Sequence, residues 1–303
     1  MTGVFFMRIA VVYGGVGEER EISLLSGARV VKALQNEGHT VLETPLFSAL
    51  PSEEQMATFA ECDAVFLVLH GGAGENGEVQ EALERVGVYH YTGSAVAASR
   101  LAMNKVRAKR RVAAFGIPVA EQFVCLADEK MKQAPFLPIA AKPICGGSSV
   151  GLQILKNEQE WGEFSPVCDM LCERYLSGRE FSVGVLERRA LPPVLIEPLG
   201  GEYDFAHKYT QNLTREVCPA NVERVRLARL QNLALLASEA LGLRDYARID
   251  FREDETGEIF FLEANTLPGM TKQSIFPLAA RVAGLEMGAL CTRMATLAAQ
   301  RRR

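Results

Sequence analysis

Residues suited to metal binding occur together near the C-terminal end of the sequence. Arg248 and Asp250 lie in one apolar segment, and Glu263 and Asn265 lie at the end of the next. Side chains alternate along a strand, so pairing across the turn at 254–257 would bring two carboxylates and an amide oxygen onto one patch. Such oxygen ligands suit Mg²⁺, especially an ion that also holds phosphate oxygens. Ordinary charges on an exposed strand pair are the alternative, but a carboxylate among apolar residues is costly without a cation, which favours the metal site.

A glycine-rich segment upstream has the features of a phosphate cover. Lys142 ends an apolar segment, and residues 144–151 add flexible backbone N–H donors together with the hydroxyl groups of Ser148 and Ser149. A simple glycine turn between two strands explains the same residues, so both interpretations stay open.

Two familiar nucleotide-binding motifs do not fit. The glycines at 146 and 151 are followed by Leu and Gln instead of Lys and Ser or Thr, so they do not form a P-loop. Gly15 and Gly17 are followed by Arg20 where the dinucleotide fingerprint has its third glycine. Neither a P-loop ATPase nor a dinucleotide-dependent dehydrogenase is favoured.

Three further positions have a structural and a chemical interpretation. The acidic residues at 18–21 open a predicted helix, where the helix dipole favours them, and they could equally face the cationic group of a substrate. His70 ends a buried segment and could orient a ligand or hydrogen-bond a loop carbonyl. Lys105 lies on a basic helix predicted over 100–115, and we expect its neighbour Lys109 to lie in solvent.

The elements around these residues predict a mixed fold. The apolar segments 8–13 and 63–70 are typical of buried parallel strands, and each is followed by a glycine loop and a helix. Residues 1–95 therefore predict a compact α/β unit whose ligands bind at the carboxyl ends of the strands.

The rest of the chain has the pattern of α+β structure. The long segment 199–219 has few apolar anchors and predicts a loop that acts as a lid or binds a ligand. Predicted strands cover 121–126, 138–143, 149–155, 171–176, 180–186, 193–197, 246–252 and 258–263, and predicted helices cover 100–115, 221–241 and the region 277–299.

Composition sets broad limits. The 303 residues are 48% hydrophobic and 23% charged, with 33 Lys and Arg against 37 Asp and Glu, which is typical of a globular protein and argues against nucleic-acid binding. No run of about 18 apolar residues predicts a membrane span. The seven cysteines are scattered and odd in number, which indicates reduced thiols and a cytoplasmic protein. Cys168 and Cys172 are expected in a core and not at zinc.

Taken together, these motifs resemble those of the ATP-grasp ligases, and within them the D-alanine–D-alanine ligase family. The matches run in family order over nearly the whole chain. They comprise residues 14–23, 69–77, 91–94, 103–105, 142–151, 207–209, 218–220, 248–250 and 262–271.

The resemblance implies an ATP-grasp fold with a Rossmann-like N-terminal domain. It divides the chain into an N-terminal substrate domain (1–95), a central ATP-grasp subdomain (96–177) and a C-terminal ATP-grasp subdomain (178–303) with a lid at 199–219. It also implies a reaction in which ATP phosphorylates one D-alanine and the amine of a second attacks the acyl phosphate, for peptidoglycan synthesis. A homodimer is implied by family analogy, and no nucleic-acid or membrane partner is expected.

The resemblance also assigns site residues, position by position. The first D-alanine would meet Glu19 and His70, and the second would meet Ser274 and the Ile275 amide. Arg248 and the Gly269 amide would stabilise the oxyanion, and Glu19, Ser148 and Tyr209 would form a hydrogen-bonded triad. Asp250, Glu263 and Asn265 would hold two Mg²⁺ ions, with Mn²⁺ as a substitute. ATP would contact Lys105, Lys142, Glu173, Arg174, Tyr175, Leu176, Glu180 and Lys208.

Alternatives remain within and beyond this family. A sister ligase that adds D-lactate or D-serine is disfavoured by the pair Lys208 and Tyr209, which resembles the alanine-adding members. A biotin-dependent carboxylase subunit fits the segments around Glu19 and His70 less well. A nucleotide-binding module without catalysis would lack some of the metal and oxyanion residues. The uncharged residues 144–146, which include Cys145, depart from the charged residues common in the family.

Overall fold

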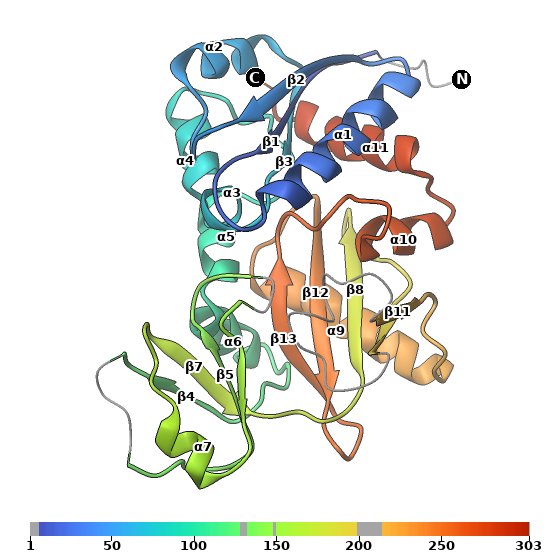
Figure 1. Cartoon of the computed structure of the whole chain (residues 1–303). Coiled ribbons are helices and arrows are strands. Elements are labelled where there is room, and N and C mark those ends of the chain that lie inside the picture. The colour runs from blue at the N-terminus through green and yellow to red at the C-terminus, as the bar shows by residue number, and fades with distance from the viewer. Residues whose placement is uncertain (1–5, 128–131, 148–149, 199–213, 303) are drawn as a thin grey trace.

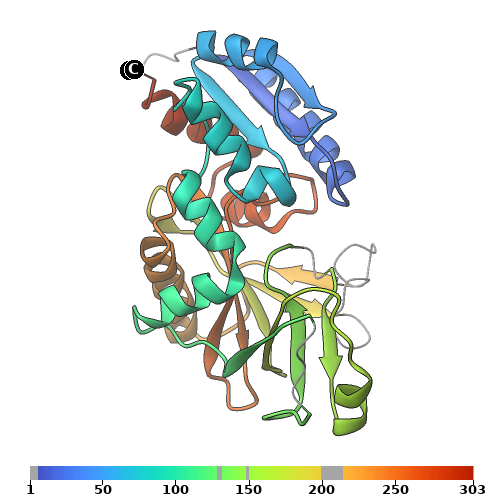
Figure 2. The ribbon, with the colours of Figure 1, turned by 90° about the vertical axis from the view of Figure 1, so that its left-hand side faces the viewer.

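The computed structural model describes residues 6–127, 132–147, 150–198 and 214–302 (Figure 1). Within these ranges the strands form three sheets; the N-terminal sheet lies at the top in both Figure 1 and Figure 2, and the other two lie below it, side by side in Figure 2. The N-terminal sheet lies at one end, and the two remaining sheets face a common cleft.

The N-terminal sheet is parallel, as predicted. Its strands are β1 (Arg8–Gly14), β2 (Thr40–Leu46) and β3 (Ala64–Val68), in the order β2-β1-β3. β1 and β3 are almost wholly buried because both faces of the sheet are covered by helices. The prediction did not include β2, whose Thr, Glu and Pro residues interrupt the apolar pattern.

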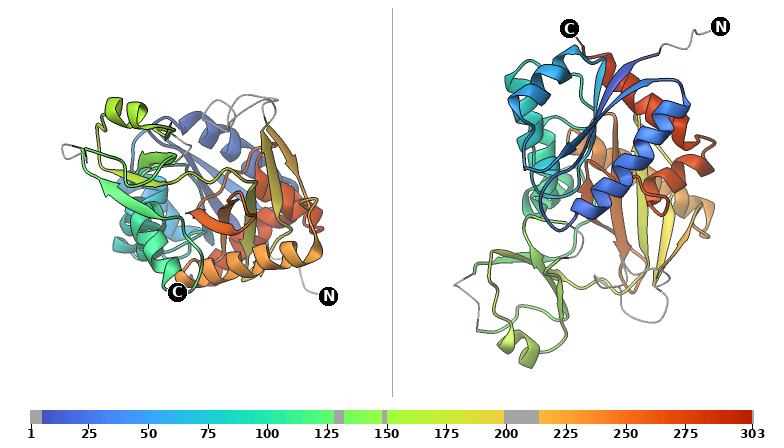
Figure 3. Two further views of the ribbon diagram at one scale, coloured as in Figure 1. Left: turned by 90° about the horizontal axis from the view of Figure 1, so that it is seen from below. Right: turned by 45° about the horizontal axis from the view of Figure 1, so that its top comes forward.

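Helices from both ends of the chain cover this sheet (Figure 3). α1 (Arg20–Asn36) is the helix predicted after the first glycine loop, and α11 (Met287–Ala299) packs beside it and against β3. The core cluster of the sheet therefore includes Leu290, Met294 and Ala298 from α11. The other elements near this sheet are α2 (Glu53–Glu61), α3 (Gly72–Glu75), α4 (Glu78–Arg85) and α10 (Ile275–Val282).

Two antiparallel sheets make up the rest of the fold. The smaller has the order β4-β7-β5-β6, from β4 (Gln122–Cys125), β7 (Met170–Arg174), β5 (Ile139–Pro143) and β6 (Gln153–Leu155). The larger has the order β11-β10-β8-β12-β13, and β9 (Arg189–Ala190) pairs with β8. Its strands are β8 (Glu180–Leu186), β10 (Val194–Pro198), β11 (Thr214–Val217), β12 (Tyr246–Glu253) and β13 (Ile259–Asn265). α7 (Glu158–Glu163) and α9 (Arg224–Ala240) pack on these sheets.

Three predicted elements differ from the structure. The helix predicted over 100–115 is two helices, α5 (Val96–Met103) and α6 (Lys105–Ala113), because Asn104 leaves the helical conformation and its side chain caps α6 by accepting a hydrogen bond from the Arg107 amide at 3.0 Å. α9 begins at Arg224 and not at 221. The end of the predicted loop 199–219 forms β11, which pairs with β10; residues 199–213 lie outside the described ranges.

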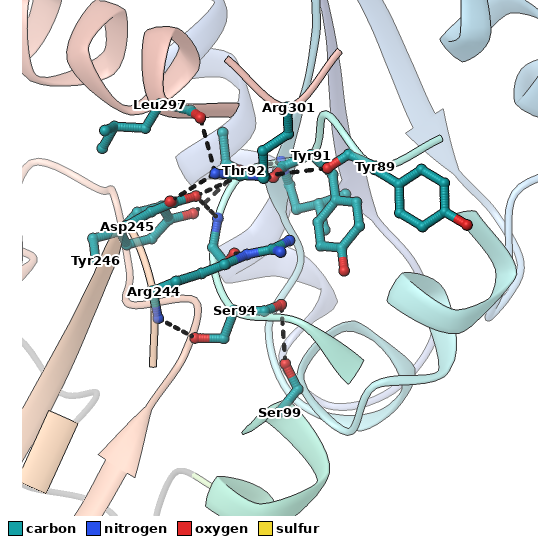
Figure 4. Close-up of polar contacts among 12 residues, drawn as sticks. Tyr89, Tyr91, Thr92, Ser94, Ser99, Arg244, Asp245, Tyr246, Leu297 and Arg301 are labelled. Carbon is teal, nitrogen blue, oxygen red and sulfur yellow. Dashed lines mark hydrogen bonds and ion pairs between the residues drawn. The ribbon is translucent and has the colours of Figure 1, made fainter. Parts of the chain in front are cut away.

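Residues 301–303 are all arginine, which predicts that they lie in solvent. Arg301 is instead held at the junction of the sheets (Figure 4). Its guanidinium forms ion pairs of 2.9 and 2.7 Å with the Asp245 carboxylate and donates to the Tyr91 carbonyl at 2.5 Å. Asp245 also accepts a hydrogen bond from the Gly93 amide at 3.1 Å. The residue that precedes β12 is thus fixed to both the N-terminal unit and the chain end.

No single helix among the described residues is long and apolar enough to span a membrane, although the bent pair α10 and α11 meets the length and composition criteria together.

Candidate active site

Two adjoining clefts lie where the three sheets meet. The first, named here the sheet cleft, lies between the smaller and larger antiparallel sheets and is lined by residues that include Lys105, Lys142, Leu176 and Glu263. The second, named the junction cleft, lies against the N-terminal unit, and its lining includes Glu19, His70, Arg248 and Ser274. Both clefts share Gly147, Glu180 and Asp250, so the two spaces adjoin at these residues.

The predicted pairing of the two acidic strands is confirmed. β12 and β13 are antiparallel, with Asp250 opposite Glu263 and Arg248 opposite Asn265. The Arg248 guanidinium binds the Asp250 carboxylate at 2.8 and 3.0 Å, and the Asn265 amide donates to the same carboxylate at 3.0 Å. Ser182 adds a hydrogen bond of 2.6 Å to Asp250. The carboxylate is therefore buried but fully matched by donors, as a charge away from water requires.

The donor set of this strand pair fits a magnesium ion shared with phosphate. Asp250, Glu263 and Asn265 offer two carboxylates and an amide oxygen, which are the hard ligands that Mg²⁺ prefers. Within the described residues no three His, Cys, Asp or Glu side chains cluster closely enough to enclose a metal. The described residues thus supply too few ligands for a closed cage, which is the usual condition of a Mg²⁺ that also binds substrate oxygens.

Lysines line the opposite side of the sheet cleft. Lys142, on β5, lies 2.5 Å from the Glu173 carboxylate on β7. Lys105, at the start of α6, contacts the Gly146 carbonyl and lies 3.8 Å from the Glu263 carboxylate. Asn104 sets the start of α6, so it determines where Lys105 enters the cleft. Phosphate groups placed here would meet cations on one side and a metal site on the other.

The prediction that Lys109 lies in solvent is wrong. The basic composition of α6 predicts it in solvent, but it is fully buried, and its ammonium group lies 2.8 Å from Glu173. Burial works against the charge of Glu173, yet ion pairs with Lys109 and Lys142 lower the pKa of this carboxyl to about 2. Lys109 lies four residues after Lys105, so the two share a helix face, and this spacing was the available signal.

The remaining predicted ATP contacts among the described residues line the sheet cleft. Glu173, Arg174, Tyr175, Leu176 and Glu180 all line it, together with apolar side chains that include Ala140, Ile154 and Leu262. The Arg174 guanidinium is bound to the exposed Glu121 at 2.5 Å, and its backbone N–H donates to the Glu121 carbonyl at 2.9 Å. A flat aromatic base would find apolar walls and backbone polar groups here.

His70 and Glu19 join the N-terminal unit to the junction cleft. The His70 ring contacts the Leu267 carbonyl and the Ser26 hydroxyl, each at 3.2 Å, and burial lowers the pKa of its imidazole. The loop-carbonyl interpretation of His70 is thus realised, and the residue still lines the cleft. A Cβ atom at Gly71 would approach the Glu19 carboxylate to 2.1 Å, so glycine is required for the loop to pass this close.

The loop before α10 completes the junction cleft. The Ser274 hydroxyl accepts a hydrogen bond from the Thr271 amide at 2.9 Å, and a side chain at Gly269 would collide with this hydroxyl. Ile275 is the first residue of α10, whose N-terminal amides favour an anion. Arg29, on α1, donates to the carbonyls of Met270 and Thr271 and holds the loop from the N-terminal unit.

Glu75 also lines the junction cleft, although the sequence analysis did not single it out. It accepts hydrogen bonds from the amides of Gly71 at 2.8 Å and Leu267 at 3.3 Å. Burial, and next the charge of Glu19, raise the pKa of Glu75 to about 7. Its place in the glycine-rich segment 71–77 was the only signal for it.

Glu75 predicts a pH-dependent stability. A carboxyl group whose pKa is higher in the folded than in the unfolded protein stabilises the fold. This contribution is fully present at pH values below its pKa in the unfolded protein, and it is lost as the pH rises through its pKa in the folded protein. The rise from 4.5 to about 7 corresponds to roughly 3 kcal/mol. Urea unfolding at pH 5 and at pH 8 would measure this effect. Between the two pH values the free energy of unfolding of the parent protein should fall by about this amount more than that of Glu75→Gln. The exposed Glu78→Gln should behave as the parent protein. Equal losses in all three proteins would contradict the assignment.

Three predicted site residues cannot be placed. Ser148, Lys208 and Tyr209 lie outside the described residues, so the triad with Glu19 and the contact of Lys208 with ATP stay predictions.

A cleft between two antiparallel sheets, beside a parallel-sheet unit, defines the protein as an ATP-grasp enzyme. A family model described as "D-ala D-ala ligase C-terminus" matches residues 112–296. The D-alanine–D-alanine ligase of Dechloromonas aromatica is 38% identical over 97% of this chain and 98% of its own length, and that of Aquifex aeolicus is 40% identical over 92% and 97%. The chain therefore belongs to the D-alanine–D-alanine ligase family.

Solved structures agree with this assignment. The crystal structure of D-alanine–D-alanine ligase from Bacillus anthracis complexed with ATP has a TM-score of 0.83 and 25% identity, with 98% of each chain covered. The VanG D-Ala:D-Ser ligase from Enterococcus faecalis has a TM-score of 0.80 at 24% identity, a likeness that concerns the fold.

Proposed function

We propose that the protein joins two D-alanine molecules at the expense of ATP, through a D-alanyl phosphate, to supply D-alanyl-D-alanine for peptidoglycan synthesis in the cytoplasm. The observation that carries the proposal is that the two clefts adjoin at Asp250, which lines both. A nucleotide in the sheet cleft would direct its phosphates toward this residue, and an amino acid in the junction cleft would present its carboxylate to the same point.

ATP binding follows from the lining of the sheet cleft. The adenine ring would lie among the apolar side chains near Leu176, and Glu180 would accept hydrogen bonds from the ribose. Lys105 and Lys142 would contact the phosphates. Asp250, Glu263 and Asn265 would hold two Mg²⁺ ions, or Mn²⁺ in their place, which neutralise phosphate charge and polarise the transferred group when bound.

Substrate roles follow from charge in the junction cleft. Glu19 would bind the ammonium group of the first D-alanine, with His70 beside its carboxylate. Arg248 is the one cation among the described residues that line this cleft, so it is placed to bind the carboxylate and to stabilise the oxyanion formed when the second amine attacks. The Gly269 amide would be its partner, and Ser274 with the Ile275 amide would hold the second carboxylate.

Several further features belong to the proposal by family resemblance. The chain would comprise a substrate domain (1–95) and two ATP-grasp subdomains (96–177 and 178–303), and it would act as a homodimer. The segment 199–219 would close over the clefts and exclude water from the acyl phosphate. Lys208 would then reach the γ-phosphate, and Tyr209 would join Glu19 and Ser148. Selection of D-alanine as the second substrate would depend on Tyr209.

The direct test is phosphate release from MgATP with identification of the product by mass. We expect release with D-alanine and formation of D-alanyl-D-alanine, and none with L-alanine. If phosphate release requires D-lactate or D-serine and yields a mixed product, the second substrate is not D-alanine, and the fold assignment is unaffected. No release with any of these substrates would overturn the proposed reaction.

A further inference from the structure

Three charged side chains form a buried cluster at the sheet cleft, and two of the three are cations. Glu173 lies between Lys109 and Lys142, at 2.8 and 2.5 Å from their ammonium groups. Glu173 is 3% exposed at its side chain and Lys109 is 0% exposed. Within these contacts two cations face one anion, and the further carboxylates that act on the lysines, Glu263 and Glu180, lie in the lining of the cleft itself. Such an excess of positive charge is costly inside a protein unless a further anion is available.

The positions of the three groups show where this charge acts. Lys142 and Glu173 line the sheet cleft, whereas Lys109 does not and lies behind them. The Lys109 ammonium also donates to the Phe261 carbonyl on β13 at 2.8 Å, so it is held in place by backbone. Lys109 therefore cannot contact a ligand in the cleft directly, but it can determine how strongly Glu173 holds Lys142.

We propose that Lys109 is a positioning residue for ATP binding: it compensates the charge of Glu173 from behind, so that the charge of Lys142 stays available to the nucleotide phosphates. Without Lys109, Lys142 and Glu173 would form a neutral pair, and the wall of the cleft would lose its net attraction for phosphate. The inference rests on the proposed function, since it takes ATP as the ligand of the sheet cleft.

A purely structural role for Lys109 predicts different behaviour. If the residue only joined α6 to β7 and β13, each further loss from the cluster would weaken the protein and its ligand site. If it acts by charge compensation, removal of the Glu173 charge should repair the loss of Lys109. Methionine has nearly the shape of lysine, and glutamine that of glutamate, so both substitutions keep the packing.

The experiment measures the binding of MgATP, without D-alanine, by titration calorimetry in four proteins. Lys109→Met should weaken binding by at least about tenfold, because a nearby charge of this kind contributes 1.4 kcal/mol or more in a low-dielectric site. The double variant with Lys109→Met and Glu173→Gln should bind MgATP more tightly than Lys109→Met alone, since Lys142 is again free of a competing anion; Glu173 is itself a predicted ATP contact, so the comparison is made with Lys109→Met and not with the parent protein. Arg110→Met, an exposed charge on the same helix, is the matched control and should leave binding unchanged.

Each outcome of this binding experiment either supports or contradicts the proposal. Recovery in the double variant supports charge compensation. A double variant as weak as Lys109→Met, or weaker, while thermal unfolding shows it folded, would overturn the inference and leave a structural role. If Lys109→Met does not fold, Lys109→Arg keeps the charge and should bind ATP as the parent does; a tenfold loss there would count against the proposal. Failure of the parent protein itself to bind MgATP would instead overturn the proposed function. Kinetics give a second readout: the Lys109→Met effect should fall on KM for ATP and spare KM for D-alanine.

Discussion

Arg248→Met should lower kcat by about a thousandfold, because it removes the cation placed to stabilise the developing oxyanion. The described lining of the junction cleft holds no other lysine or arginine, so no neighbour can substitute for it. The Arg248 guanidinium is also held in a fixed orientation by Asp250, at 2.8 and 3.0 Å. Initial rates of phosphate release at saturating MgATP and D-alanine would measure the effect.

Two companion variants make this result specific. Arg248→Lys keeps the charge but not the two-point contact with Asp250, and we expect it to fall between the parent protein and Arg248→Met. Arg293→Met removes a surface arginine that is paired with Glu187 far from the clefts, and it should leave the rate unchanged. A loss smaller than about tenfold in Arg248→Met would remove Arg248 from the chemical step.

Glu263→Gln should have the second large effect, expressed as a changed requirement for magnesium. Glu263 is one of two carboxylates among the three predicted ligands Asp250, Glu263 and Asn265, and its loss would halve the negative charge that these ligands supply. We expect the Mg²⁺ concentration for half-maximal activity to rise at least about tenfold, with kcat reduced about a hundredfold. Activity measured against Mg²⁺ concentration at fixed ATP would show both.

The matched control for this variant lies just before the same strand. Glu258 is exposed and paired with Arg229, so Glu258→Gln changes the charge of the protein equally but leaves the metal site intact. An unchanged Mg²⁺ requirement in Glu263→Gln, with Glu258→Gln behaving as the parent, would show that Glu263 does not bind the ion.

The strand pair of the candidate metal site could be predicted because the determining signals are local. A short turn joins β12 to β13, and alternation places Asp250 and Glu263 on one face, so pairing follows from neighbouring residues alone. The parallel unit was predictable for a similar reason, since β1 and β3 are short continuous apolar runs followed by glycine loops.

The incorrect predictions concern mainly residues whose positions depend on contacts distant in the sequence, which override the structural preference of the local sequence. Within α6 only the four-residue spacing from Lys105 indicates that Lys109 is buried, because its partner Glu173 comes from a strand more than sixty residues later. Arg301 has the composition of a frayed end and yet binds Asp245 and the Tyr91 carbonyl. Asn104 could have indicated the break between α5 and α6, since asparagine is a favoured N-cap, but a continuous basic pattern concealed it.

The role of α11 in the N-terminal core has a consequence for synthesis on the ribosome. Leu290 and Met294 are translated long after β1, yet they fill the core of the sheet that contains it. One face of the first sheet to emerge therefore stays incompletely covered until α11 has been made, and Arg301 adds its contacts later still. Folding of this unit joins residues nearly three hundred positions apart, and such contacts slow folding and expose nascent chains to aggregation.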